Sequence, residues 1–434
     1  MKTCEECGAQ TELDAYFSKV RIGGRKKRIL CPTCIEYHKH EKGRRIYRDL
    51  LFGVVFGLIL LVNKEIPWLF LNFYLIFVMM YLSIVPHELG HAFAVWLTRQ
   101  ELLYIRFGRG HRWFAKKVRG FYLDFQSQPM GGFVGYTHRH TGLIRITEAF
   151  IYACGPLVNI GLFLLIWLVF PDIIKHESFS KTFAPGLAFS SANLILGLSN
   201  LFPYKLQTRH GSIPNDGMGI LKSLFGKHET RNIAIDRNLR HALVAFEYQD
   251  YRSCQVYAKR VVELDNTDVR GRNMLAVSLD NLGEVDSAIN ILEQTLDLPN
   301  IDDGIKAILQ SNLSYFYLDK GDPANYAKAL ELSDSAMHNF SWELSVLSNY
   351  GGIQVVAGDV DKGIRALRDK RYVISPPYVL AEIHALLAIG RSRKGEVDLA
   401  EKELNTARKL DPKCRFLPRA AAVSELKHQP TELT

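Results

Sequence analysis

Two histidines one helical turn apart are the first residues of this chain with a clear capacity for chemistry. The sequence HELGH runs from His87 to His91, and residues four apart lie on the same face of an α-helix. Two imidazoles so placed can bind one Zn²⁺ ion, and Glu88 beside them can hold and deprotonate a water molecule on that ion. Because zinc lowers the pKa of its bound water toward neutrality, hydroxide would be available for attack on a carbonyl.

Such a site needs a third protein ligand, and the residues alone leave several candidates open. We expect an Asp, Glu or His near the end of another apolar segment, with one coordination position left for water. Asp216, in the sequence PNDG, is one candidate. The others are Glu148, Asp124, His138, His140 and His210.

Four of the seven cysteines form a second candidate metal site. Two C-x-x-C pairs, Cys4/Cys7 and Cys31/Cys34, are separated by 23 residues. Four thiolates so arranged complete a closed tetrahedral Zn²⁺ site. A segment this small lacks an adequate apolar core, so metal would supply much of its folding free energy. We therefore predict that residues 1–48 form a small structural zinc module, which resembles zinc ribbons.

The remaining cysteines stand alone in the sequence. They are Cys154, Cys254 and Cys414. An odd count with isolated thiols argues against an oxidised, secreted chain. The polar sequence MKTCEECGAQ at the start predicts no cleavable signal peptide.

Four apolar runs surround the histidines. They cover residues 47–62, 66–97, 149–170 and 183–202. A helix needs about 20 apolar residues to cross a bilayer. We expect four membrane spans, and ionisable side chains within such a span are a functional hypothesis by default. Pro86, directly before His87, should kink the second helix or open it to water.

The charge pattern supports a multi-pass membrane protein. The chain has 434 residues, is 47% hydrophobic and carries a net charge of +9, which excludes collagen-like, disulfide-scaffold and wholly disordered chains. Residues 1–48 carry 12 Lys/Arg against six Asp/Glu, and residues 98–148 carry nine against three. Basic and neutral loops alternate, so the positive-inside rule places both termini in the cytoplasm, most simply at the cell (inner) membrane. Beside spans, such charge indicates topology and lipid contact, and nucleic acid is an unlikely partner.

Two further segments have patterns of their own. In residues 98–148, FYLDF and FVGY alternate like strands between glycines, which predicts one or two β-hairpins at the membrane surface. From about residue 240 the chain repeats: Gly283, Gly321, Gly358 and Gly395 follow one another at intervals of 38, 37 and 37 residues. Small residues recur five positions after three of these glycines. The pattern resembles tetratricopeptide (TPR) repeats, pairs of helices with a period of about 34.

Several motifs in residues 50–221 together resemble the site-2 protease family of intramembrane zinc metalloproteases. HELGH in an apolar run is followed in order by PMGGFVGY, ACGPLVN, SNLFP and an Asp-Gly. The resemblance implies that His87, His91 and Asp216 bind zinc and that Glu88 is the general acid/base. It also implies that Gly131, Gly132 and Asn159 hold the substrate. Two departures are visible: YKLQTRHGSIPN separates Pro203 from Asp216, and Asn215 replaces the family's leucine before the aspartate.

The roles of two asparagines and one Gly-Pro pair have alternatives. Asn159 is an amide within an apolar run, which itself suggests a hydrogen-bonding duty. Gly155-Pro156 can equally be a helix kink, and Asn200 in SNLFP fits a structural role as well as a catalytic one.

We therefore predict a mainly α-helical protein of three parts. These are a zinc-ribbon-like module (1–48), a polytopic protease core of about four spans with a small β-element (49–237) and a TPR-like α-solenoid with a disordered tail (238–434). The predicted function is that of an intramembrane zinc endopeptidase with one catalytic and one structural zinc. It would cleave a membrane-spanning protein, while the repeats bind that substrate or a cytoplasmic partner. The alternative is a non-proteolytic zinc-binding membrane scaffold that assembles partners through its repeats.

Overall fold

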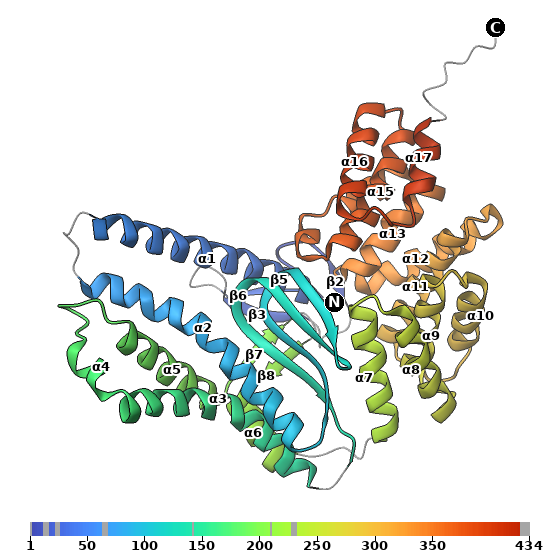
Figure 1. Cartoon of the computed structure of the whole chain (residues 1–434). Coiled ribbons are helices and arrows are strands. Elements are labelled where there is room, and N and C mark those ends of the chain that lie inside the picture. The colour runs from blue at the N-terminus through green and yellow to red at the C-terminus, as the bar shows by residue number, and fades with distance from the viewer. Residues whose placement is uncertain are drawn as a thin grey trace. The chain divides into compact units, whose positions relative to one another are not determined.

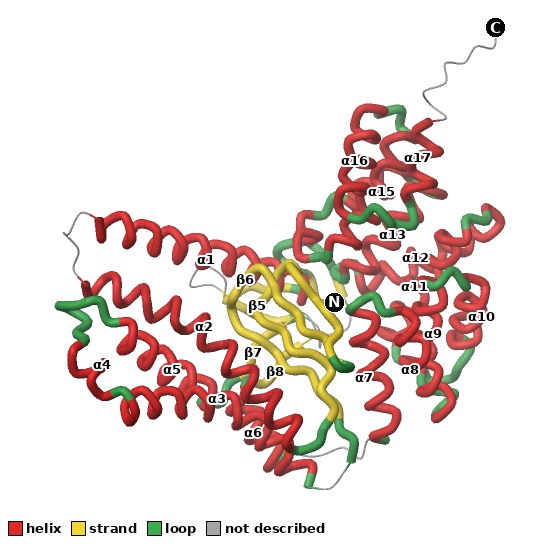
Figure 2. Tube along the Cα trace, viewed as in Figure 1, coloured by secondary structure: helices red, strands yellow, loops and turns green. Residues whose placement is uncertain are grey.

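The computed structural model describes residues 2–11, 17–21, 27–62, 68–140, 143–208, 211–226 and 232–425, and the chain in these ranges is mainly helical (Figure 2). It divides into two compact units. The core unit is Lys39–Arg237, and the repeat unit joins Met1–His38 to Asn238–Thr434.

Three packed helices form the framework of the core unit. Its helices are α1 (Pro32–Val62, which starts in the repeat unit), α2 (Trp68–Leu97), α3 (Ile144–Val169), α4 (Pro171–His176), α5 (Pro185–Leu201) and α6 (Asp216–Phe225). Helices α2, α3 and α5 pack against one another, and α6 packs on α3. Fully buried alanines lie in this packing, including Ala94 of α2 and Ala188 and Ala192 of α5. Side chains this small let helix backbones approach closely.

Among the described residues, two helices are long and apolar enough to cross a membrane. They are α2, with 30 residues, and α3, with 26. This is weak support, because the core helix of a soluble protein can have the same length and composition. The sequence predicts four spans, and the other two are not shown. The apolar part of α1 is confined to residues 47–62, and α5 has 17 residues, so both are shorter than the about 20 that a bilayer needs.

Strands β5 (Glu101–Val118) and β6 (Phe121–Thr137) form a β-element where the sequence predicts one. Both strands bend, so that Tyr104 pairs with one residue from each half of β6. Two of the bends use glycines in the left-handed region, Gly108 at φ 89° and Gly131 at φ 81°, a conformation that other residues rarely adopt. The curled pair lies against α2 (Figure 2). It therefore brings the Gly-Gly sequence of β6 to the histidine helix.

The repeat unit contains a series of antiparallel helix pairs (Figure 1). Its helices are α7 (Ile233–Glu247, which starts in the core unit), α8 (Tyr251–Leu264), α9 (Val269–Asn281), α10 (Val285–Leu296), α11 (Asp303–Lys320), α12 (Tyr326–Phe340), α13 (Leu344–Ala357), α14 (Val360–Leu367), α15 (Pro377–Arg393), α16 (Val397–Leu410) and α17 (Leu417–Glu425), with 3₁₀ turns η1 (Pro323–Asn325) and η2 (Lys370–Ile374). The predicted recurring glycines lie at the turns or helix ends, and the predicted small residues Ala288, Gly363 and Ala400 are buried in the second helices. The TPR-like helical repeats are therefore confirmed.

The N-terminal segment is part of the repeat unit, which differs from the predicted three-part division. It contains two short antiparallel pairs, β1 (Lys2–Thr3) with β2 (Gln10–Thr11) and β3 (Ser18–Arg21) with β4 (Lys27–Leu30). Apolar side chains of this segment share one buried cluster with residues of α11, α12 and α13. The segment is too small to bury its own apolar surface, and the repeats supply the missing partner surface.

Replacing Gly363 by alanine tests the packing of the α13–α14 helix pair. A Cβ atom there would lie 2.7 Å from the backbone nitrogen of Val355 and 2.8 Å from the carbonyl oxygen of Gly351. Because backbone cannot move aside cheaply, we expect a loss of about 1–3 kcal/mol in stability, measured as faster amide hydrogen exchange in α13 and α14. Gly161→Ala is the control, since nothing lies within 4 Å of a Cβ there. Equal exchange in both variants would contradict this packing.

Candidate metal centres

Three residues far apart in the sequence converge in the core unit. The Nε2 atom of His87 lies 3.1 Å from Oδ2 of Asp216, and Nε2 of His91 lies 3.4 Å from Oδ1 of the same carboxylate. The two Nε2 atoms are 3.2 Å apart. Ligand atoms at the corners of a tetrahedral zinc site are roughly 3.3 Å apart, given metal–ligand distances of about 2.0–2.1 Å. The three side chains, here named the His–His–Asp site, therefore fit one divalent metal ion.

Hydrogen bonds behind the histidines fix which ring nitrogen faces the site. His87 Nδ1 lies 2.6 Å from Oδ1 of Asn159, and His91 Nδ1 lies 2.7 Å from the carbonyl oxygen of Ile151. Both acceptors require an N–H at Nδ1, which leaves each Nε2 free to bind metal. The amide nitrogen of Asn159 donates to Ser83 O and to Oδ1 of Asn193.

This arrangement differs from the predicted substrate-binding role of Asn159. Its side chain is fully buried and bonded to protein at both ends. The amide orients His87, and the hydrogen-bonding duty that the sequence suggests is directed at the protein itself.

Asp216 is the first residue of α6, and a network around Asn215 holds it in place. Asn215 Oδ1 accepts from the backbone nitrogens of Met218 (3.1 Å) and Tyr204 (2.9 Å). Its Nδ2 donates to the carbonyl oxygens of Asn200 and Phe202. The N-cap thus ties the start of α6 to the end of α5.

The unexpected insertion before Asp216 is a β-hairpin. Strands β7 (Lys205–Thr208) and β8 (Gly211–Pro214) pair antiparallel, and Asn215 N donates to Tyr204 O across their base. The chain therefore returns to the point it left, which explains how Asp216 reaches the histidines despite the added residues. Burial opposes the charge on Asp216, but the adjacent His87 and His91 favour the ionised carboxylate and lower the pKa of the carboxyl to about 2.

A cleft of about 460 Å³ opens on the His–His–Asp site. Its lining includes Glu88, Gly131 and Gly132. A Cβ atom on Gly132 would lie 2.6 Å from Oε1 of Glu88, so any larger residue there would displace the Glu88 carboxylate from its present position. Glu88 lines the same cleft as the three candidate ligands. Its carboxylate could therefore accept a proton from a water molecule on a metal ion there.

The other candidate ligands have different partners. Glu148 pairs with His138 at 3.0 Å and with Ser223, and buried Asp124 pairs with Arg106 and Arg112. His140 lies 3.2 Å from Gln100. His210 lies outside the described residues. Asn200 donates from its side chain to Leu196 O within its own helix, as a structural residue would.

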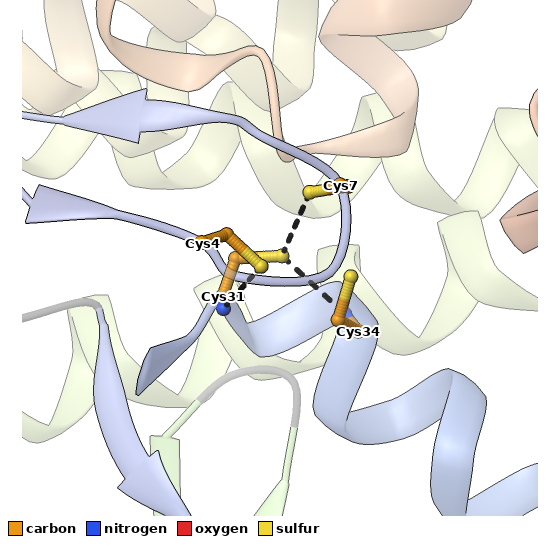
Figure 3. A group of neighbouring side chains, drawn as sticks. All are labelled: Cys4, Cys7, Cys31 and Cys34. Atoms are coloured by element: carbon orange, nitrogen blue, oxygen red, sulfur yellow. Dashed lines mark hydrogen bonds between the residues drawn. The ribbon is translucent and has the colours of Figure 1, made fainter. Parts of the chain in front are cut away.

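The second centre is in the repeat unit, where the two C-x-x-C pairs meet (Figure 3). All four sulfur atoms lie within 4.8 Å of one another. Cys4 and Cys7 lie in the turn between β1 and β2, while Cys31 and Cys34 lie at the start of α1. The backbone nitrogen of Cys31 donates to Cys4 Sγ (3.3 Å), as that of Cys34 does to Cys31 Sγ (3.4 Å). We name this group the four-cysteine site.

The chemistry of the four-cysteine site suits a closed metal site. Hydrogen bonds with Cys31 and Cys34, together with the positive charge of Arg371, lower the pKa of Cys7 to about 7, while contacts with Cys4 and Cys7 raise the pKa values of Cys31 and Cys34. Thiolate is the form that binds metal. Cys154, Cys254 and Cys414 are free thiols that belong to neither cluster, as their isolation in the sequence predicts.

Comparisons with known proteins bear on the repeats. No family model matches the chain, and no curated protein does. A thermophilic TPR protein of Thermus thermophilus is 18% identical, with a TM-score of 0.34 over 44% of this chain and 98% of that one. YrrB, described as a TPR protein with an unusual peptide-binding site, is 13% identical, with a TM-score of 0.29 over 43% and 91%. MamA from Desulfovibrio magneticus is 16% identical, with a TM-score of 0.30 over 41% and 96%.

These comparisons correct the predicted enzyme class. The sequence predicts a zinc metalloendopeptidase, but the matching structures named here are described as TPR and MamA proteins, and none of them as a protease. The resemblance to site-2 proteases is likewise not shown by any match. The physical reason is that two imidazoles and a carboxylate define a metal site without defining a reaction. A neighbouring glutamate can accept a hydrogen bond from a water molecule on a structural ion.

Replacing Gly155 by alanine tests the His–His–Asp site. A Cβ atom at this position of α3 would lie 2.3 Å from Nε2 of His91. The ring must therefore move, and we expect Co²⁺ affinity at this site to fall at least about tenfold, as when outer partners of metal ligands are lost. The absorption of bound Co²⁺ measures it, with Gly161→Ala on the same helix as the control. Unchanged affinity in Gly155→Ala would show that His91 is not a ligand.

Proposed function

We propose that this chain is a membrane-anchored, zinc-binding scaffold that assembles a protein partner through its TPR-like repeats. The observation that carries the proposal is the series of stacked helix pairs from α7 to α16. Arrays of this kind present an extended concave surface for binding another protein. The apolar helices α2 and α3 would anchor the chain, and the basic loops of the core unit favour a cytoplasmic position for both termini.

In this proposal each cluster holds one zinc ion. The His–His–Asp site would join α2 to α6, because two ligands come from one helix and the third from the other. A water molecule would complete the coordination, with Glu88 as its hydrogen-bond acceptor. The four-cysteine site offers the closed set of thiolates that is typical of structural zinc.

Metal analysis of the purified chain tests both sites. We expect two zinc ions per wild-type chain. Each of the variants Cys4→Ser and Asp216→Ala should keep one zinc ion, because each substitution removes a ligand from a different site. Cys254→Ser is the control, since its buried thiol belongs to neither cluster. Two ions with unchanged affinity in Asp216→Ala would show that Asp216 is not the third ligand.

A reconstitution experiment tests the scaffold itself. The wild-type chain and Glu88→Gln would be placed in proteoliposomes with a protein that is cross-linked to the repeats in the native membrane. We expect both chains to bind this partner equally and to leave it intact, because the repeats bind and the metal is structural. Metal-dependent cleavage by the wild type, lost in Glu88→Gln at full zinc content, would overturn the scaffold. Deletion of α9–α12 should abolish partner binding, while deletion of an unrelated loop should not. If both deletions reduced partner binding equally, the proposed role of the repeats would be wrong.

A further inference from the structure

The N-terminal segment is held on the repeats by an apolar cluster. Phe17, Leu30 and Ile35 are buried together with Phe340, the last residue of α12, and Trp342, two residues beyond it. The rings of Phe17 and Trp342 meet edge to face, with centroids 6.4 Å apart. These contacts remove the apolar face of the α12–α13 corner from solvent. Without the segment, that face would be exposed.

A buried arginine of the repeats reaches the four-cysteine site itself. Arg371, in η2, is 3% exposed. Its Nη1 atom lies 3.2 Å from the sulfur of Cys7, 3.8 Å from that of Cys31 and 4.0 Å from that of Cys34. The guanidinium thus directs one edge at three of the four candidate ligands.

The opposite edge of Arg371 is fixed by Asp369. Nε and Nη2 each donate to this carboxylate at 2.8 Å, and the backbone nitrogen of Arg371 does so at the same distance. The planar guanidinium can serve two partners at once in a fixed geometry. Asp369 therefore presets the direction in which Nη1 points.

The charges explain why an arginine is buried at this place. Four thiolates exceed the charge of one Zn²⁺ ion, so a buried zinc–thiolate centre needs hydrogen-bond donors around its sulfurs. A buried guanidinium in turn is costly unless it is paired on every side. Each group supplies what the other lacks, although they lie at opposite ends of the sequence.

We propose that zinc in the four-cysteine site is a clasp that holds the N-terminal segment on the repeats, and that Arg371 is the positioning residue that completes it. Loss of the metal would release the segment and expose the face around Phe340 and Trp342. The inference rests on the proposed zinc in this site. It is independent of the His–His–Asp site and of any partner.

Titration of the metal-free full chain with Co²⁺ tests the role of Arg371. Of the two candidate centres, only the four-cysteine site has sulfur ligands, so the sulfur-to-cobalt absorption band reports this site alone. We expect Arg371→Met to weaken binding by about 10–100-fold, as is usual when an outer partner of metal ligands is removed. Arg371→Lys should recover part of the affinity, because it keeps a donor but not the two-edged geometry.

Two further variants complete this test. Lys370→Met is the matched control, because the neighbouring lysine pairs with Glu6 and lies over the ring of Tyr37, and no hydrogen bond from its ammonium group to a sulfur is among those described. Such pairs contribute little, so its affinity should stay within about twofold of the wild type. Asp369→Asn keeps Arg371 but weakens the contact that orients it, and should also weaken Co²⁺ binding. This variant keeps the test decisive even where Arg371→Met fails to fold. Wild-type affinity in both Arg371→Met and Asp369→Asn would overturn the positioning role.

Hydrogen exchange tests the clasp. Removing the metal from the wild-type chain with a chelator should speed exchange at the α12–α13 corner and leave α15 and α16 unchanged. Unchanged exchange at this corner in a chain shown to have lost its metal would overturn the clasp. Absence of the sulfur-to-cobalt band in the wild-type chain would show that the four-cysteine site does not bind the metal. This result distinguishes failure of the proposed zinc site from failure of the clasp.

Discussion

The core unit depends on one buried amide. Asn159 sits among apolar helices, where an unsatisfied amide would cost several kcal/mol. It avoids this cost by bonding to two residues of α2, through Ser83 O and His87 Nδ1, and to Asn193 of α5. All three helices must therefore be in register at once, because a shift of any one would leave part of the amide without a partner. The orientation of the His87 ring follows from the same packing that holds the helices together.

Those parts of the sites that are set by local spacing could be predicted from the sequence. The i, i+4 spacing of His87 and His91 fixes their common helix face, and each C-x-x-C pair fixes two sulfurs at one turn. The third ligand could not be derived in this way, because the position of Asp216 depends on how α6 packs on α3. Only the family resemblance distinguished it from five rivals. The hairpin before it was also missed, although a glycine between two short runs was a usable signal.

Arg371 shows why some site residues leave no trace in a sequence. Its surroundings, RDKRYV, read as an exposed basic turn, and only tertiary structure buries one of these charges against sulfurs near the N-terminus. The repeats were easier to predict, since their period is local and recurs along the chain. The spans were only partly predictable, because apolar runs shorter than about 20 residues suit a buried helix as well as a short span. The packing of the N-terminal segment on the repeats could not be predicted either, because the sequence does not show which apolar helix faces of the repeats remain without a packing partner.

The hairpin of β7 and β8 has a consequence for how this chain can change. Tyr204 and Asn215 are joined by hydrogen bonds at its base. The hairpin therefore leaves the core unit and returns to it at the same place. Such a hairpin can become longer or shorter without a change in the distance between its two ends. This makes the segment a place where evolution can vary length freely, and where an epitope or a fluorescent reporter can be inserted with the metal ligands left in position.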